Sequence, residues 1–317
     1  MRRRWIDEAT YADIVALCQS LPGPTSSEVG IAIGLLRAGP FGAFLAWLGF
    51  TLPSAFLMFV VAFALDRVIG TVGPVGRALE LVALVVVAFA VWRMARALAW
   101  DARRGAIALA AAVLALGWHD QYAQVAIILL AALAGRLVIP AVAIGARVVH
   151  PVPIGRRVAV ACGALYLALL LVLPVARVTA PSSEIALFDS FYRSGAFVFG
   201  GGHVVLPLLQ KEVVPPGWVR RDQFLAGYGA AQILPGPLFT FAVYLGAVID
   251  GVIGAAIALV AIFLPAFLVV FAALPSWGVL RARTWAQSAL SGVNAGVVGL
   301  LLAALIGLAS SAIASLP

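Results

Sequence analysis

Two short stretches of the chain carry the same helix-breaking pattern: SLPGP at residues 20–24 and ILPGP at residues 233–237. In each stretch two prolines bracket one glycine; proline kinks or breaks a helix and glycine accepts turn conformations, so no helix runs unbroken through either stretch. The rest of the chain is apolar, because 64% of its 317 residues are hydrophobic and 11% are charged. A soluble domain carries roughly 25% charged residues. The sequence therefore predicts an all-α, polytopic membrane protein whose helices are broken twice in the same way.

Apolar runs of the length that crosses a bilayer, about 20 residues, recur along the chain. We expect full-length spans at 40–65, 78–100, 121–139, 158–174 and 252–274, a weaker apolar helix at 105–117 and an interrupted apolar run at 185–209. The last run, 286–315, is long enough for one tilted span or a broken pair. Shorter helices flank the breaks, at 5–20 and 25–37 around the first and at 218–233 and 238–249 around the second. Interrupted segments at matching places in two halves are the best sequence indication of a transporter's binding site.

The two breaks belong to an internal repeat with an offset of 213 residues, which becomes 212 after one deletion. The matched pairs include Trp5 and Trp218, Gln19 and Gln232, Pro22-Gly23-Pro24 and Pro235-Gly236-Pro237, Gly34 and Gly246, Gly39 and Gly251, and Leu52-Pro53 and Leu264-Pro265. Apolar composition alone would not align glycine, proline, tryptophan and glutamine. We therefore expect two homologous halves, 1–139 and 158–317, joined by a proline- and arginine-rich linker at 140–157. Compared with each other, the first half lacks its first helix and the second half is shortened at its end.

The number of expected crossings between the two repeats is odd, so the halves face opposite sides of the membrane. This predicts an inverted repeat with a pseudo-twofold axis in the membrane plane. Arginine clusters between the apolar runs are typical of cytoplasmic loops, and placing them inside agrees with the count. The N-terminal arginines at 2–4 are the exception, because the same count places them outside.

Helix starts at the breaks have the chemistry of an anion site. Pro24 and Pro237 are each expected at the first position of a new helix, where a missing N–H costs nothing. The N–H groups that follow lack helical partners and carry a partial positive charge. In a membrane they must face a polar cavity or a ligand. Two such N-termini meeting near the midplane would bind an anion without a formally charged side chain.

The first break continues as TSSEVG and the second as LFTFAVYLG. The hydroxyls of residues 25–27 suit an oxyanion, although Thr25 and Glu28 also have the spacing of a helix capping box. Glu28 is either a carboxyl inside the membrane that carries a proton or a hydrated group near an interface. Gln19 and Gln232 precede the breaks and either cap carbonyls or contact substrate.

Two further polar positions lie in apolar runs. His203 follows three glycines and is a candidate for binding an anion or a proton, although such glycines also serve close helix packing, and Asn294 lies in the last run. The full set of candidate substrate-binding residues is Gln19, Pro22, Gly23, Pro24, Thr25, Ser26, Ser27, Glu28, Gly200, Gly201, Gly202, His203, Gln232, Pro235, Gly236, Pro237, Thr240, Tyr244 and Asn294.

Motifs for other chemistry are missing from the sequence. The only lysine, Lys211, lies in no phosphate-binding loop, and no cysteine and histidine spacing fits a metal. We therefore expect no enzyme, no cofactor and no nucleic-acid partner, only a lipid bilayer and a substrate moved by an ion gradient, the membrane potential or a partner. GxxxG spacings at Gly30/Gly34 and Gly292/Gly296 allow close helix contacts within one chain or in a homodimer.

The motifs assembled above resemble the chromate ion transporter (CHR) family. They are WIDEATYADIVALCQSLPGPTSSEVGIAIGLLRAGPFGAFLAWLGFTLPSA at 5–55, FVFGGGHVVLPLLQKEVV at 197–214, GWVRRDQFLAGYGAAQILPGPLFTFAVYLGA at 217–247 and SGVNAGVVGLLLAAL at 291–305. The resemblance implies a bacterial inner-membrane protein of two homologous halves that exports chromate from the cytoplasm and lowers its toxicity. It also places the family's glycine motif at 200–202. A Phe-Gly-Gly-Pro motif in the family's first helix has no counterpart here.

Two alternatives remain open at this point. Sulfate and chromate are both tetrahedral dianions of similar size, so the chain could transport sulfate or another oxyanion. A membrane partner subunit that no longer transports is the second alternative, and it predicts that altering the glycines of the two breaks has no effect.

Overall fold

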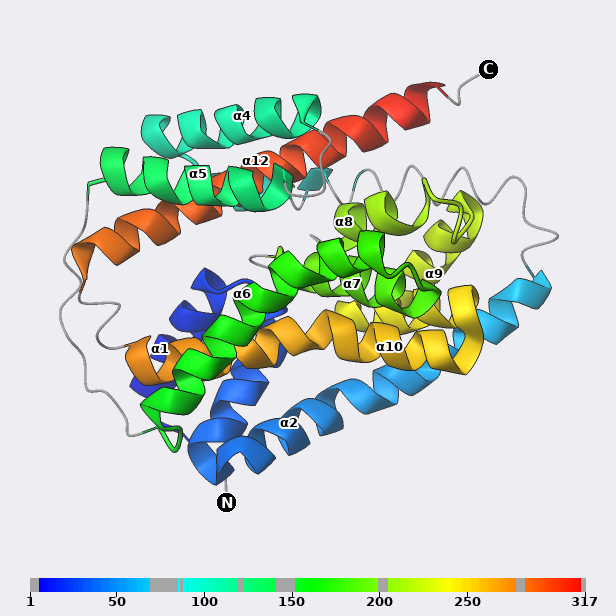
Figure 1. The fold of residues 1–317 in the computed structure, drawn as a ribbon, viewed down its shortest axis with the longest axis horizontal. Coiled ribbons are helices and arrows are strands. Elements are labelled where there is room, and N and C mark those ends of the chain that lie inside the picture. Colours follow the sequence, from blue (N-terminus) through cyan, green and yellow to red (C-terminus); the bar gives the residue numbers. More distant parts are fainter. Residues whose placement is uncertain are drawn as a thin grey trace. The chain divides into compact units, whose positions relative to one another are not determined.

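The computed structural model is helical throughout the part of the chain it describes, which is residues 6–68, 85, 88–89, 91–118, 123–140, 152–198, 205–277 and 283–314 (Figure 1). Its elements are α1 (Glu8–Ser20), α2 (Thr25–Val68), α4 (Ala102–Gly117), α5 (Ala123–Val138), α6 (Arg156–Thr179), α7 (Ser183–Ala196), α8 (Val205–Val213), α9 (Arg221–Ile233), η3 (Leu238–Thr240), α10 (Phe241–Ala273), η4 (Leu274–Ser276) and α12 (Thr284–Ala314). The all-helical prediction is confirmed for these residues.

Four helices in this part of the chain are long and apolar enough to cross a membrane: Thr25–Ala64, Arg156–Thr179, Leu238–Ser276 and Thr284–Gly307. The run expected at 121–139 forms the shorter apolar helix α5. The interrupted run at 185–209 forms two short helices, α7 and α8. Outside the described residues lie 78–84, 86–87 and 90 of the span expected at 78–100, most of the linker at 140–157, and residues 2–4.

Two of the spanning helices have a kink at equivalent positions of the repeat. In α2 the backbone leaves the helical conformation at Ala38 and Gly39, and in α10 it does so at Asp250 and Gly251. Gly39 has φ of +68° and Gly251 has φ of +55°, a region that favours glycine. These kinks separate the segments that the sequence predicts as distinct helices, 25–37 from 40–65 and 238–249 from 252–274.

The described chain divides into two compact units, and each takes segments from both halves of the sequence. The first contains residues 1–79 and 150–275, and in it α10 packs against α2, α6 and α7. The second contains residues 80–149 and 276–317, where α12 packs against α4 and α5. The boundary between homologous halves expected near residues 140–157 remains a prediction.

Close helix contacts are made by small residues in the second unit and by aromatic rings in the first. In the second unit, a Cβ on Gly292 would overlap Gly135 of α5 and the carbonyl of Ala131. The GxxxG spacing at Gly292/Gly296 therefore serves packing within the chain. In the first unit α2 and α10 meet through aromatic rings, with Trp47 and Phe263 centred 5.6 Å apart. This packing brings the two breaks into the same unit.

Candidate anion-binding site

The first break is a turn between α1 and α2. Leu21 follows the end of α1 in an extended conformation, with φ of −91° and ψ of 153°. Gly23 has φ of +149°, which a residue with a side chain rarely adopts. Its N–H donates a hydrogen bond of 2.6 Å to the carbonyl of Val198, which lies just after α7. The first break is therefore tied to the end of α7.

The second break lies between α9 and α10 and is held by a different contact. Gly236 has φ of +136°, and the three residues after Pro237 form the short helix η3. The Thr240 hydroxyl donates a hydrogen bond of 2.9 Å to the carbonyl of Pro237. The Ser54 hydroxyl of α2 lies 2.7 Å from Thr240 Oγ1 and donates to it, because Thr240 uses its own proton on Pro237. The second break is therefore tied to α2.

At both breaks the helix begins one residue later than the sequence predicts, so each proline precedes the helix and is not its first residue. α2 begins at Thr25, and the carbonyl of Pro24 accepts the first helical hydrogen bond, 2.9 Å from the Glu28 N–H. Pro237 caps η3 with φ of −71° and ψ of 130°. Since Thr25 lies inside the helix, it cannot cap it, and neither its hydroxyl nor the Glu28 carboxylate has a hydrogen-bond partner among the described residues. The capping-box interpretation is therefore wrong.

Each break packs against a helix from the other half of the sequence. A Cβ on Gly236 would overlap the Ser54 side chain of α2. A Cβ on Gly23 would lie 3.5 Å from the Cβ of Ala266 in α10. Ser54 and Ala266 are equivalent positions of the repeat, each directly after a Leu-Pro pair. Glycine is therefore required at position 236 for two reasons: its positive φ and the close approach of Ser54.

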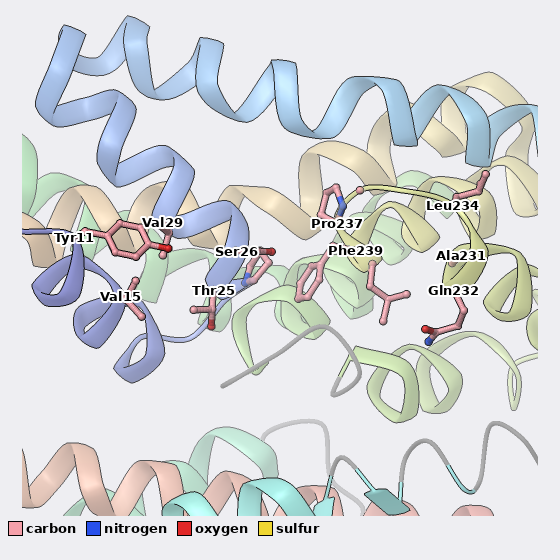
Figure 2. Close-up of a pocket in the computed structure, with 13 residues that line it drawn as sticks. Tyr11, Val15, Thr25, Ser26, Val29, Ala231, Gln232, Leu234, Pro237 and Phe239 are labelled. Atoms are coloured by element: carbon pink, nitrogen blue, oxygen red, sulfur yellow. The ribbon is translucent and has the colours of Figure 1, made fainter. Parts of the chain in front are cut away.

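A cavity of about 660 Å³ lies between the two breaks (Figure 2). α1, the first turn of α2, the end of α9 and the second break form its walls. Figure 2 shows Thr25 and Ser26 at the start of α2, with Pro237 and Phe239 of the second break across from them. The lining residues are Tyr11, Val15, Pro24, Thr25, Ser26, Val29, Ala231, Gln232, Leu234, Gly236, Pro237, Leu238 and Phe239.

Helix dipoles and neutral polar groups provide the electrostatics of this cavity. None of its described lining residues has a charged side chain. The first N–H groups of α2 have no partners within the helix and carry its partial positive charge. Thr25 Oγ1 is buried and has no hydrogen-bond partner among the described residues. This arrangement of N–H and hydroxyl donors can bind an anion.

Two further polar residues lie directly behind the lining of the cavity. Ser27 is 1% exposed and Glu28 is fully buried. Neither the Ser27 hydroxyl nor either carboxylate oxygen of Glu28 has a hydrogen-bond partner among the described residues. The Glu28 carboxylate lies against Gly23, where an added Cβ would overlap it. Buried polar groups are nearly always hydrogen-bonded, so these exceptions mark the first break as a candidate functional site.

The structure brings only part of the predicted site together. Pro24, Thr25, Ser26, Gln232, Gly236 and Pro237 line the cavity, and Gly23, Ser27, Glu28 and Thr240 adjoin it. Gln19 and Pro235 are exposed and Pro22 is half-buried. Tyr244 instead donates a hydrogen bond of 2.8 Å to the carbonyl of Gln223. Asn294 belongs to α12 in the second unit, and Gly200, Gly201, Gly202 and His203 lie outside the described residues.

Sequence reasoning missed Ser54 and a buried charge network. Ser54 had a signal, because it follows the Leu52-Pro53 pair that matches Leu264-Pro265 in the repeat. The network also had a signal, since Asp189 and Arg193 are one helical turn apart within an apolar run. Opposite charges inside a membrane segment are expected to pair with each other.

The charge network joins α6, α7 and α8. Asp189 is fully buried and accepts two hydrogen bonds from Arg193, from Nε and Nη2, each 3.0 Å long. Arg193 Nη2 also donates to Glu212 of α8 at 3.1 Å, and Ser190 donates to the same carboxylate at 2.9 Å. Arg177 Nη1 of α6 contacts Asp189 at 3.4 Å. The network fixes the position of α7. Val198, just after the end of this helix, accepts the hydrogen bond from the first break.

Comparison with known proteins gives the family. The profile described as Chromate transporter matches residues 1–136 and 185–316. The chain is 31% identical to a chromate transport protein of Pseudomonas aeruginosa, over 96% of this chain and 73% of that relative. It is 28% identical to a chromate transport protein of Cupriavidus metallidurans, over 99% of this chain and 76% of the relative. It is also 24% identical to an uncharacterized transporter of Methanocaldococcus jannaschii, over 96% of this chain and 76% of that relative.

No solved structure matches the chain significantly. The profile covers most of the sequence, including both Pro-Gly-Pro breaks, and the relative from Pseudomonas aeruginosa is similar over nearly the whole chain. The chain therefore belongs to the chromate transporter family.

Proposed function

We propose that this protein exports chromate from the cytoplasm across the bacterial inner membrane and so confers resistance to it. The cavity between the two breaks carries the proposal, because the start of α2 and the unpartnered Thr25 hydroxyl provide donors for an oxyanion. Membership of the chromate transporter family supports chromate as that oxyanion. The four helices that are long and apolar enough to span a bilayer support a multi-pass membrane protein.

Chromate would bind here by replacing part of its hydration shell with protein donors. The free N–H groups at the start of α2 and the hydroxyls of Thr25 and Ser26 would point at its oxygens. A cavity of about 660 Å³ also leaves room for water around the ion. Since no described lining residue is cationic, the ion is held weakly enough to leave, which transport requires.

We place the two breaks near the membrane midplane, in an inverted repeat of residues 1–139 and 158–317. The reciprocal contacts of Ser54 with Gly236 and of Ala266 with Gly23 support a pseudo-twofold relation between the breaks. In transporters of this design one repeat rocks against the other around a site at their interface. The breaks would then open to the two sides of the membrane in turn.

The test measures chromate accumulation in a sensitive bacterial host. Cells with this protein should accumulate less labelled chromate than cells with empty vector. Everted membrane vesicles should take chromate up, because their interior corresponds to the outside of the cell. The double variant Gly23→Ala/Gly236→Ala should lose both effects, since both glycines have a positive φ and an added Cβ would overlap neighbours.

Gly49→Ala is the matched control, because Gly49 is helical and an added Cβ there meets open space. All variants are compared at equal amounts in the membrane. Unchanged accumulation with the parent protein, or full activity of the double variant, would contradict the proposal.

Sulfate or another oxyanion is the second candidate substrate. N–H and hydroxyl donors recognise any tetrahedral dianion, and these are the donors that the cavity offers. Vesicle uptake of labelled chromate should be measured against increasing sulfate. Strong competition at equal concentrations would favour a general oxyanion transporter, whereas weak competition would favour chromate.

A further inference from the structure

Glu28 is a buried acid beside the cavity. It lies in the first turn of α2 and is fully buried. Neither carboxylate oxygen has a hydrogen-bond partner among the described residues, and no ion pair in this part of the chain includes it. A carboxylate in such surroundings is costly while it is ionised and unpaired. Binding a proton removes that charge.

The same helix end serves both Glu28 and the cavity. Pro24, Thr25, Ser26 and Val29 line the cavity, and Glu28 follows Thr25 by three residues, or about one helical turn. The partial positive charge at the start of α2 attracts any anion within its first turn. An ionised Glu28 and an oxyanion in the cavity would therefore compete for one source of positive potential and would also repel each other.

The groups around Glu28 do not supply a compensating cation. From α1 the Cys18 thiol interacts with it electrostatically, and from α6 the Tyr166 hydroxyl does so. From α10 the nearest side chain at the Gly23 turn is Ala266, which does not titrate. Among the described residues, the groups facing Glu28 are thus neutral or become negative on losing a proton. Among the groups that the structure describes, none is a positive partner for an ionised Glu28.

We propose that Glu28 is a proton-binding site coupled to the cavity, so that the oxyanion binds when the Glu28 carboxyl carries a proton and leaves when that proton is lost. This rests on the oxyanion site proposed above. The proton comes from water and attaches to a carboxyl oxygen, with no other bond made or broken. Because coupling between two ligands is reciprocal, binding of the oxyanion also favours proton uptake. When the substrate leaves, the ionised Glu28 carboxylate replaces it as the anion that interacts with the positive start of α2.

The experiment measures how many protons the full-length protein takes up when it binds sulfate. Sulfate is the probe because it stays a dianion throughout the neutral range, whereas chromate itself takes up a proton near neutrality. Calorimetric titrations of the purified protein in detergent, in two buffers of different ionisation enthalpy, give the protons taken up per sulfate. Repeating them at several pH values gives the change in affinity.

At pH values where Glu28 is ionised without ligand, we expect the parent protein to take up about one proton per sulfate and its affinity to fall about tenfold per pH unit. Glu28→Gln should take up about one proton fewer and hold its affinity as pH rises. Glu28→Asp keeps a titratable carboxyl, so its sulfate affinity should depend on pH as in the parent protein. Glu8→Gln is the control, since Glu8 is an exposed acid in the first turn of α1, and it should behave like the parent.

Two results would overturn the inference. One is sulfate binding by the parent protein with no proton uptake and no change of affinity at any pH of the series, a measurement that does not depend on the folding of any variant. The other is a folded Glu28→Gln variant that takes up as many protons as the parent. If the parent binds neither sulfate nor chromate at any pH, the proposed oxyanion site fails, and the coupling fails with it. Binding without coupling contradicts only the role of Glu28.

Discussion

Ser54 of α2 lies against Gly236, the turning point of the second break, and hydrogen-bonds Thr240 just after it. The two residues are 182 positions apart in the sequence. Their contact means that a helix of the first half shapes the break of the second half. At the equivalent position of the repeat, Ala266 approaches Gly23, but its side chain forms no hydrogen bond. The helix of the other half therefore contacts the first break by packing alone and the second break also by a hydrogen bond.

Replacing Ser54 tests whether α2 holds the second break. Ser54→Ala removes one buried hydrogen bond and should lower the free energy of unfolding in detergent by about 1 kcal/mol. Ser54→Leu should cost about 1–3 kcal/mol, because the larger side chain overlaps Gly236. Thermal unfolding measures both, with Ser310→Ala as an exposed control. Equal stability of the alanine and leucine variants would contradict a tight contact.

Thr25 should contribute to oxyanion affinity through its hydroxyl. Thr25→Val keeps the shape of the side chain but removes the donor, and we expect sulfate and chromate affinity to fall about tenfold. Thr51→Val is the matched control, since Thr51 Oγ1 is also buried without a hydrogen-bond partner among the described residues but does not line the cavity. Titration calorimetry compares the two. A similar loss in both variants would mean that Thr25 acts through folding alone.

Breaking the charge network should destabilise the protein strongly. Asp189→Asn leaves Arg193, which is 7% exposed, without its bidentate partner. Removing one member of a buried pair typically costs about 3–5 kcal/mol. Arg177→Ala should lower the free energy of unfolding by less, because the Arg177 side chain is 30% exposed and contacts Asp189 at 3.4 Å. Unfolding in detergent provides the comparison, and an Asp189→Asn variant as stable as the parent would contradict the structural role.

The exposed pair of Arg220 and Asp222 should give a small, pH-dependent effect. A hydrogen bond from Arg220 holds the pKa of Asp222 below its ordinary value. Such a group stabilises the folded state above its unfolded pKa, about 3.9, and this contribution is lost as pH falls through the folded pKa. Arg220→Ala should therefore cost less than about 1 kcal/mol at neutral pH, because the pair is exposed.

At a pH below the folded pKa of Asp222, its carboxyl is protonated in both the folded and the unfolded state, so parent and variant should be equally stable. The measurement is thermal unfolding at both pH values. A difference that grows as the pH falls would have the wrong sign for this pair.

Local sequence alone determined the helices and where they break. Pro22, Gly23 and Pro24, and their repeat at residues 235–237, predict the breaks because two prolines around one glycine strongly disfavour a continuous helix. The kinks at Gly39 and Gly251 follow from local sequence as well, and so does the apolar character of the spans. The matched Leu52-Pro53 and Leu264-Pro265 pairs make Ser54 and Ala266 equivalent positions, a signal that sequence reasoning did not use.

Only the tertiary structure decided which side chains share the cavity and which do not. Tyr11 and Phe239 line it, whereas Tyr244 faces the carbonyl of Gln223. The structure also showed that Thr25 does not cap α2 and that Glu28 is buried against Gly23. These outcomes depend on contacts between residues far apart in the chain. A local pattern specifies the backbone, but the way helices pack decides where each side chain lies.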